Sequence, residues 1–231
     1  MQHTAAVLTG HVGRVRLFQE FMTDSVTVDG LPSVAVRGNV DGASILVLGT
    51  GMGGPATVRA THAIVELGCN VVIRAGGAGP VAPHVKTGDL LIATAVVRHE
   101  GSSDTYLPDG WPALADPEVV TALCRATLDL GGNYKAGVLH SKDSFFGEID
   151  PGSSPVSEEL RARWSAWVRL GVLGSEMEAA ALFAVASHLG IRAGAILRVN
   201  DVTQSGDVNE AERQLCQIAL RAAATLGTSD E

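Results

Sequence analysis

Short runs rich in Val, Ile and Leu recur along the chain, separated by segments rich in Gly and polar residues. Several of these runs are apolar at every position, as strands are when both faces of their sheet are covered. The pattern therefore predicts strands over residues 5–9, 44–48, 70–73, 89–97, 136–140 and 192–199.

Segments with the apolar spacing of amphipathic helices lie between these strands. The spacing predicts helices over residues 54–67, 117–130, 157–170, 177–188 and 209–226. Alternating strands and helices predict a three-layer α/β/α architecture, and the length of 231 residues suits one domain over residues 1–231. Two longer stretches without periodicity, 100–116 and 143–155, are expected to be loops.

Composition narrows the class of partner. The formal net charge of −8 and the pI near 5.3 argue against nucleic acid. No apolar run approaches the roughly 20 residues that span a bilayer. The three cysteines are far apart without metal-ligand spacing, and the N-terminus lacks the pattern of a signal peptide. We therefore expect a cytoplasmic protein that binds a small molecule, with no metal site, nucleic acid or membrane.

The run Glu176-Met177-Glu178 lies where a short apolar strand is predicted to pass into a helix. Carboxylates at a helix N-terminus are stabilised by the helix dipole, and beyond a strand end they can reach a ligand. Carboxylates in this position can accept hydrogen bonds from paired sugar hydroxyls. The alternative is that Glu176 and Glu178 only satisfy the helix start, as acids in a first turn usually do.

Two arginines follow other predicted strands. Gly10 ends the first strand, and Arg14 lies in the first turn of the next helix, so a backbone N–H and a guanidinium face a common point. Arg74 leaves an apolar strand into glycines, where it can make forked contacts to an oxyanion. It could equally pair with an acid such as Glu178. Together these residues predict a ligand that carries an anion and a hydroxylated sugar.

A second glycine-rich segment supports a different class of enzyme. Gly49, Gly51 and Gly54 follow a strand and open a helix, with the spacing of a dinucleotide-binding loop. That fold has an acid after the next strand to hold the ribose, whereas this chain has Arg74 there. An arginine at this position can serve a 2′-phosphate, so an NADP-dependent reductase is kept as an alternative.

Six segments match the motifs of a known family in their order along the chain: residues 10–15, 51–57, 74–79, 83–89, 141–146 and 176–178. Over about residues 7–226 the sequence resembles the nucleoside phosphorylases that include uridine phosphorylase and the hexameric bacterial purine nucleoside phosphorylases. The resemblance implies an α/β/α sandwich with a central mixed sheet. It also implies a pentosyltransferase that cleaves an N-glycosidic bond with phosphate, giving free base and ribose 1-phosphate. No cofactor is implied beyond phosphate as co-substrate, and the expected assembly is a homo-oligomer built on dimers.

The resemblance assigns three groups of binding residues. The phosphate-binding residues of the family correspond to Gly10, Arg14, Arg74 and Gly77. The ribose-binding residues correspond to Glu176, Met177 and Glu178, with Glu178 holding the 2′- and 3′-hydroxyls. The base-binding residues correspond to Phe145, which would stack on the base, and to Gly79, Glu148 and Asp201. A phosphate bound beneath the sugar would stabilise its oxocarbenium character and then capture it.

The expected leaving-group acid favours a purine. In the purine members an aspartate matching Asp201 protonates N7, adjusted by an arginine matching Arg213, whereas the uridine enzymes have an arginine in place of the aspartate. Glu148 and Asp150 lie where the uridine enzymes read uracil with Gln and Arg, and ionised carboxylates only accept hydrogen bonds. These acids would disfavour uracil. The alternative is that they are solvated loop residues, that Asp201 caps a turn and that Arg213 lies in solvent.

At three places the sequence lacks residues with which the family contacts phosphate or the sugar. Leu31 stands where a second arginine comes from a neighbouring subunit, unless a shifted alignment brings in Arg37. Gly77 and Ala78 replace Ser or Thr, and His3 is too close to the first strand to reach a neighbour's sugar. Each lost charge-assisted hydrogen bond costs about 1.5–3 kcal/mol. A nucleosidase that uses water and a non-catalytic nucleoside-binding protein are therefore kept as alternatives.

Overall fold

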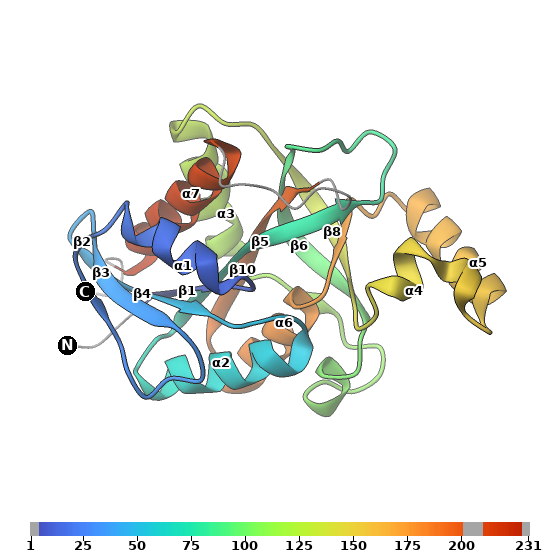
Figure 1. The fold of residues 1–231 in the computed structure, drawn as a ribbon, viewed down its shortest axis with the longest axis horizontal. Coiled ribbons are helices and arrows are strands. Elements are labelled where there is room, and N and C mark those ends of the chain that lie inside the picture. Colours follow the sequence, from blue (N-terminus) through green and yellow to red (C-terminus); the bar gives the residue numbers. More distant parts are fainter. Residues whose placement is uncertain (1–4, 201–209, 228–231) are drawn as a thin grey trace.

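The apolar runs of the sequence form the centre of one sheet in the computed structural model, which describes residues 5–200 and 210–227. β1 (Ala5–Thr9) lies between β4 (Ala43–Gly49) and β5 (Val71–Pro80) and runs parallel to both (Figure 1). Successive residues of β1 alternate between two hydrophobic cores, one on each face of the sheet. Because both faces are covered, these strands are apolar throughout rather than at alternate positions.

The sheet is mixed, and part of it closes on itself. The strand order is β10 (Arg192–Val199), β6 (Leu90–His99), β8 (Tyr134–Lys142), β9 (Gly174–Glu176), β5, β1, β4, β3 (Ala35–Val40) and β2 (Thr23–Thr27). β10 also pairs in parallel with β5, so β5, β10, β6, β8 and β9 form a ring of paired strands. β7 (Ala113–Leu114) pairs with β6. The ring brings the carboxyl end of β5 against both β9 and the end of β10.

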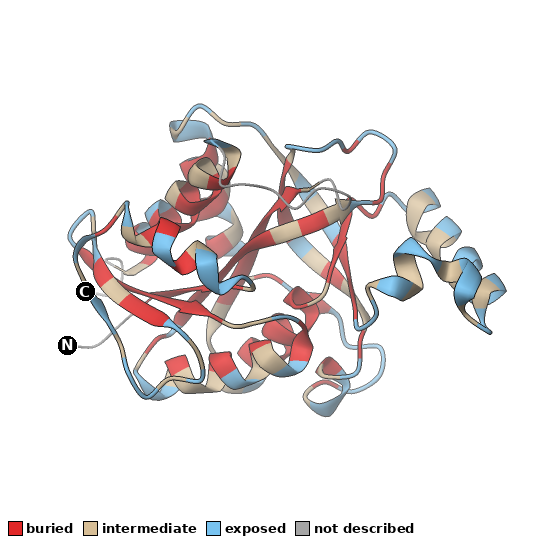
Figure 2. Ribbon diagram, in the orientation of Figure 1, coloured by how far each residue is buried: buried red, intermediate tan, exposed pale blue. Residues whose placement is uncertain are grey.

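Helices cover both faces of the sheet. α1 (Val12–Gln19), α3 (Pro117–Asp129) and α7 (Glu210–Gly227) pack on one face, and α2 (Gly54–Glu66) and α6 (Ala179–Leu189) pack on the other (Figure 1). In Figure 2 the buried residues follow the strands and the inward sides of these helices. The three-layer α/β/α architecture predicted from the sequence is confirmed. Within the described ranges, no helix combines the length and apolar character needed to cross a bilayer.

Local sequence determines the helix ends nearest the strand ring. α6 is buried around its whole circumference from Ala179 to Ala186, and Gly190 ends it in the left-handed conformation. α2 begins after Gly53, whose φ of 88° is readily adopted by glycine, and Pro55 lies in its first turn. Gly53 precedes the first residue of α2, so its backbone N–H has no partner within the helix and can donate to a group from another element.

β5 differs most from the prediction. The sequence pattern ended this strand at residue 73 and assigned Arg74 to a loop, but the strand continues to Pro80. Residues 75–78 pair with β10, and Gly79 and Pro80 pair with β9. Because β10 and then β9 supply paired strands along its whole length, the ladder keeps this glycine-rich stretch extended despite its low strand propensity.

Other differences lie at the edges of the sheet. The sequence pattern missed β2 and β3, which are short and carry polar residues. The two expected loops contain short elements: η1 (Ser103–Thr105), β7, α4 (Phe146–Ile149) and η2 (Pro151–Ser153). α5 (Ser157–Arg169) buries none of its residues and extends away from the sheet together with α4 (Figures 1 and 2).

Candidate active site

Arg74 lies on β5, only 4% exposed, between two carboxylates. Nε donates to Glu176 Oε2 at 2.9 Å, and Nη2 pairs with Glu178 Oε2. Burial alone would lower the pKa of the guanidinium, but the charges of Glu178 and Glu176 outweigh it and raise the pKa. The pairing of Arg74 with Glu178 that the sequence suggested is present, and Arg74 is a fixed cation.

Glu176 ends β9 and supports the start of α6. Its carboxylate accepts hydrogen bonds from the backbone N–H groups of Glu178 at 2.9 Å and Ala179 at 3.0 Å, and from the Ser141 hydroxyl. The first turn of a helix leaves such N–H groups without intrahelical partners. The helix-start interpretation therefore holds for Glu176. Both glutamates, however, precede the first residue of α6 instead of lying in its first turn.

Glu178 lies at the wall of a cavity. Oε1 accepts a hydrogen bond from the Gly53 N–H at 2.7 Å, and Oε2 accepts one from the Met177 N–H at 3.3 Å. Burial raises the pKa of this carboxyl, and Arg74 opposes the rise. Glu178 therefore ties the segment before α2 to β5 while its side chain still lines the cavity.

A second ion-pair cluster lies beside the first. Arg14 Nε donates to Glu212 Oε2 at 2.7 Å, and Arg14 Nη1 donates to Thr9 Oγ1 at 2.9 Å. Arg198 Nη2 pairs with Glu212 Oε1 at 2.9 Å. Burial would raise the pKa of Glu212, but the hydrogen bonds and charges of the two arginines lower it. Glu212 of α7 is thus an ionised anchor that holds Arg14 near the end of β1.

These side chains surround a cavity of about 370 Å³ at the carboxyl ends of β1, β5 and β10. The predicted site residues that line it are Gly10, Arg14, Arg74, Gly77, Gly79, Phe145, Glu148, Glu176, Met177 and Glu178. The fold therefore brings the expected phosphate, ribose and base groups to one place. Asp201, the predicted catalytic acid, lies outside the described residues.

Arg213 is not brought to this cavity. Its guanidinium pairs with Glu20 Oε2 at 2.6 Å and lies 4.8 Å from the centre of the Phe21 ring. Neighbouring helix positions point about 100° apart, so Arg213 faces Glu20 and Phe21 at the C-terminal end of α1, while Glu212 faces Arg14 near its N-terminal end. The role of Arg213 in adjusting a catalytic acid stays a prediction, because Asp201 lies outside the described residues.

Lys142 and Glu148 form an ion pair in the wall that also contains Phe145. Lys142 Nζ lies 2.6 Å from Glu148 Oε2 and donates to Ser175 Oγ at 2.7 Å. Ser175 in turn donates to Glu148 Oε2 at 2.5 Å. Both contacts use Oε2, which leaves Oε1 for a ligand. Glu148 accepts in both contacts, as predicted for an ionised carboxylate, and Lys142 adds a donor beside it that the sequence did not suggest.

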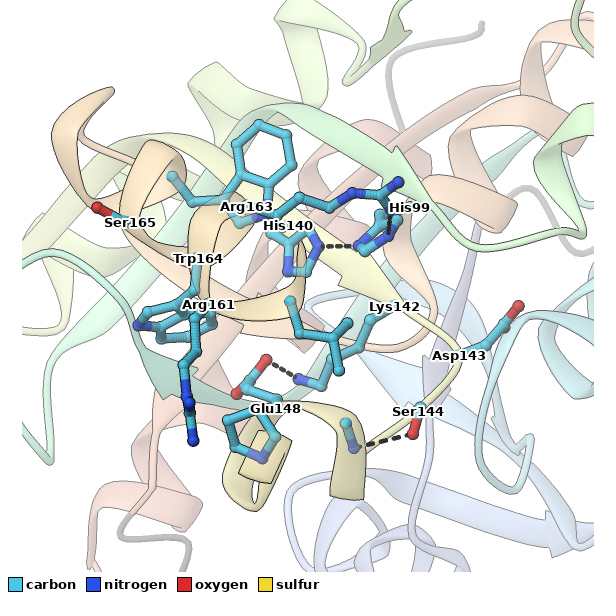
Figure 3. Close-up of a pocket in the computed structure, with 14 residues that line it drawn as sticks. His99, His140, Lys142, Asp143, Ser144, Glu148, Arg161, Arg163, Trp164 and Ser165 are labelled. Atoms are coloured by element: carbon cyan, nitrogen blue, oxygen red, sulfur yellow. Dashed lines mark hydrogen bonds and ion pairs between the residues drawn. The ribbon is translucent and has the colours of Figure 1, made fainter. Parts of the chain in front are cut away.

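A second cavity, of about 560 Å³, lies between β8 and the α4–α5 arm (Figure 3). Lys142 and Glu148 line both cavities. Figure 3 shows their charged ends meeting, with Arg161 and Trp164 on one side and Ser144 on the other. The ion pair therefore lies between the predicted ligand cavity and this second cavity.

His140 is buried next to this ion pair. Its Nε2 lies 3.0 Å from His99 Nδ1, and its Nδ1 lies 3.1 Å from Ser175 Oγ (Figure 3 shows the histidine pair). Burial, with smaller contributions from charge repulsion by His99 and Lys142, lowers the pKa of His140 to about 3. The neutral ring thus helps to position Ser175, which contacts both members of the pair.

Neutral His140 makes the stability of the fold sensitive to acid. Its pKa falls from 6.5 to about 3 on folding, so between these values the unfolded chain binds more protons and stability decreases as the pH decreases. We expect His140→Gln to weaken this pH dependence by up to about 1.4 kcal/mol per pH unit. Urea unfolding followed by tryptophan fluorescence at several pH values measures the slope.

His84→Gln provides the matched control, because it makes the same substitution at an exposed position. If His140→Gln lost stability on acidification as steeply as the parent, the assignment of a neutral buried histidine would be wrong.

Sequence reasoning assigned no role to four residues of this site: Lys142, Ser175, Asn200 and Glu212. Lys142 lies within a segment that carried the family resemblance, but its sequence neighbours are polar, so the apolar pattern did not distinguish it. Nothing local distinguishes Ser175 or Glu212. Their contacts depend on segments that are distant in the chain and meet only in the fold.

Comparisons with known proteins agree with this arrangement. The chain matches the model of the Phosphorylase superfamily over residues 4–229. It is 38% identical over 166 residues to uridine phosphorylase of Treponema pallidum, covering 72% of this chain and 64% of that protein, just under two thirds of its length. It is 30% identical over 233 residues to uridine phosphorylase of Escherichia coli, covering 96% and 92%. It is 29% identical over 211 residues to guanosine phosphorylase of Halorubrum lacusprofundi, covering 91% and 83%.

Proposed function

Because this chain belongs to the phosphorylase superfamily, we propose that it cleaves the N-glycosidic bond of a purine-type nucleoside with phosphate. The products are the free base and ribose 1-phosphate, and phosphate is a co-substrate rather than a cofactor. The pairing of Arg74 with Glu178 in one cavity carries the proposal, since it puts an anion-binding cation beside a carboxylate that can hold sugar hydroxyls. The relatives named uridine phosphorylase and guanosine phosphorylase support a nucleoside as substrate.

Phosphate binds to the cations at the ends of β1 and β5. Arg14 and Arg74 line the cavity, and Gly10 lies close to the Arg74 guanidinium. Their carboxylate partners hold both guanidinium groups in place, so their N–H donors are oriented before the ligand arrives. As the bond from C1′ to the base breaks, the bound phosphate stabilises the positive sugar and forms the new C1′–O bond.

Ribose is held by the run at the end of β9. Glu178 accepts hydrogen bonds from the 2′- and 3′-hydroxyls, with help from the backbone of Met177. The contacts of Glu178 with Gly53 and Arg74 keep its carboxylate from turning away. Glu176 supports the ribose site indirectly, because its carboxylate holds Arg74 and the start of α6 in place.

The base stacks on Phe145 near Gly79 and meets the Lys142–Glu148 pair. The ammonium donates to a carbonyl, and Glu148 Oε1 accepts from the adjacent N–H, a pattern that fits O6 and N1 of a 6-oxopurine. Uracil carries a similar edge, so the preference for a purine rests on Asp201 as the acid that protonates N7. The guanosine phosphorylase relative favours this reading, while the uridine phosphorylases favour a pyrimidine.

We further propose that the enzyme is a cytoplasmic homo-oligomer built on dimers. The support is the family resemblance, in which active sites borrow residues across a subunit interface. Arg37, considered as a replacement for the borrowed arginine, lies on β3 opposite Leu46 of β4 and does not line the cavity of its own chain.

Product analysis with and without phosphate tests the reaction. We expect inosine or guanosine to give free base and ribose 1-phosphate, with a rate that rises and saturates with phosphate, and uridine to react more slowly. Chromatography of the base and of the phosphorylated sugar measures both products. Free ribose formed at a rate independent of phosphate would make the protein a nucleosidase, and tight binding without products would make it a binding protein.

Glu178→Gln tests the sugar contact. Removing the negative charge weakens the hydrogen bonds to the hydroxyls, so we expect kcat/KM for a ribonucleoside to decrease about 10- to 100-fold. The matched 2′-deoxyribonucleoside should lose less, because it lacks one of the two hydroxyls. Equal losses for the two sugars would show that the contact does not involve the 2′-hydroxyl.

The Lys142–Glu148 pair is tested by neutralising both partners together. In Lys142→Met/Glu148→Gln no charge is left unpaired, so a purely structural pair would leave the nucleoside KM near the parent value. We expect this KM to increase about tenfold with little change in the phosphate KM, because the hydrogen bonds to the base are lost. Steady-state kinetics with each substrate varied in turn measures the two constants.

A further inference from the structure

Asn200 lies against Gly77 where the ends of β5 and β10 meet. Asn200 directly follows β10, and its backbone N–H donates to the Ala78 carbonyl at 3.0 Å. A Cβ built on Gly77 would come well inside 3.0 Å of Asn200 Nδ2, closer than real Cβ atoms approach. The Asn200 amide therefore occupies the space that any side chain at residue 77 would need.

The amide also has an unusual hydrogen-bond state. Its Oδ1 is buried and has no hydrogen-bond partner in the part of the chain that the structure describes. Asn200 is only partly buried, and it lines the cavity together with Arg14, Arg74 and Gly77. Native structures seldom leave a buried polar atom unsatisfied, and each such atom needs an explanation, such as a role in catalysis or a bound water or ion. The fold thus keeps an amide at this position although its oxygen gains nothing from the protein.

The end of β5 lacks a side chain that can donate a hydrogen bond to an anion. Residues 76–79 of β5 carry no polar side chain, so this strand end offers phosphate only backbone groups after Arg74. A carboxamide nitrogen carries two N–H donors. With Gly77 beneath it, that nitrogen stands where the hydroxyl of a serine or threonine at residue 77 would otherwise lie.

We propose that the Asn200 amide donates a hydrogen bond to the phosphate and that Gly77 is required to make room for it. The inference rests on the proposed function, because it names a further ligand of the same phosphate site. Gly77 and Asn200 then form one unit, in which the loss of a hydroxyl from β5 is offset by an amide from the end of β10.

Four variants test the unit: Asn200→Ala, Asn200→Asp, Gly77→Ser and the double variant Gly77→Ser/Asn200→Ala. The dissociation constant of inorganic phosphate is measured by calorimetry, and the phosphate KM is measured in the nucleoside assay. We expect Asn200→Ala to weaken phosphate binding about 10- to 100-fold. Asn200→Asp should weaken it further, since a carboxylate of the same shape repels the anion and donates nothing.

Gly77→Ser alone should also weaken binding, because its side chain collides with the amide. The double variant should bind phosphate more tightly than Gly77→Ser or Asn200→Ala, since the serine hydroxyl then enters the space left by the amide. Circular dichroism and melting temperature check that each variant is folded. If Gly77→Ser does not fold, Asn200→Ala and Asn200→Asp decide the question by themselves.

Two results would overturn the proposal while leaving the proposed function intact. One is a parent protein that binds phosphate and needs it for activity, with Asn200→Ala binding phosphate equally well. The other is Asn200→Asp matching the parent, which would make the amide an acceptor rather than a donor. A parent that neither binds phosphate nor responds to it would instead overturn the proposed function, and this inference with it.

Discussion

The buried ion pairs of Arg74 with its two glutamates hold the site together. They join β5 to β9 and the start of α6, and through the Gly53 N–H they reach α2. Burying charged groups is unfavourable unless each finds well-placed partners, and here both carboxylates also accept backbone hydrogen bonds. The ring of strands makes this possible, since the pairing of β5 with β9 brings Arg74 to a glutamate 102 positions away in the chain.

Charge balance decides how this site can bind an anion. Arg14 and Arg74 line the cavity, and in the described part of the chain Arg14 pairs with Glu212 and Arg74 pairs with Glu176 and Glu178. These carboxylates offset the positive charge of both guanidinium groups, which weakens their net attraction for phosphate. Affinity must then come from N–H donors held in the correct directions. The donors at the ends of β5 and β10 therefore matter for the choice between phosphate and water as the attacking group.

The two ends of the cavity belong to parts of the fold with different constraints. The cations and the sugar-holding run lie on or next to the paired strands, where a shift would break the ladder hydrogen bonds. The base-facing residues Phe145 and Glu148 lie on the arm that leaves the sheet after β8, and that arm is largely exposed. Residues on the arm can change with little effect on the core. This agrees with relatives that are named for different nucleosides over nearly the same aligned length.

The sequence by itself determined the layers, most strands and helices, and the groups of residues that line the cavity. Apolar periodicity is local, and motifs that combine Gly, Arg and Glu at strand ends are readable without a structure. Only the tertiary structure decided that β5 continues past Arg74, that Lys142 pairs with Glu148, and that Glu212 rather than Arg213 faces the site. Each of these depends on pairing or helix rotation between distant segments, and no local pattern encodes which partners will meet.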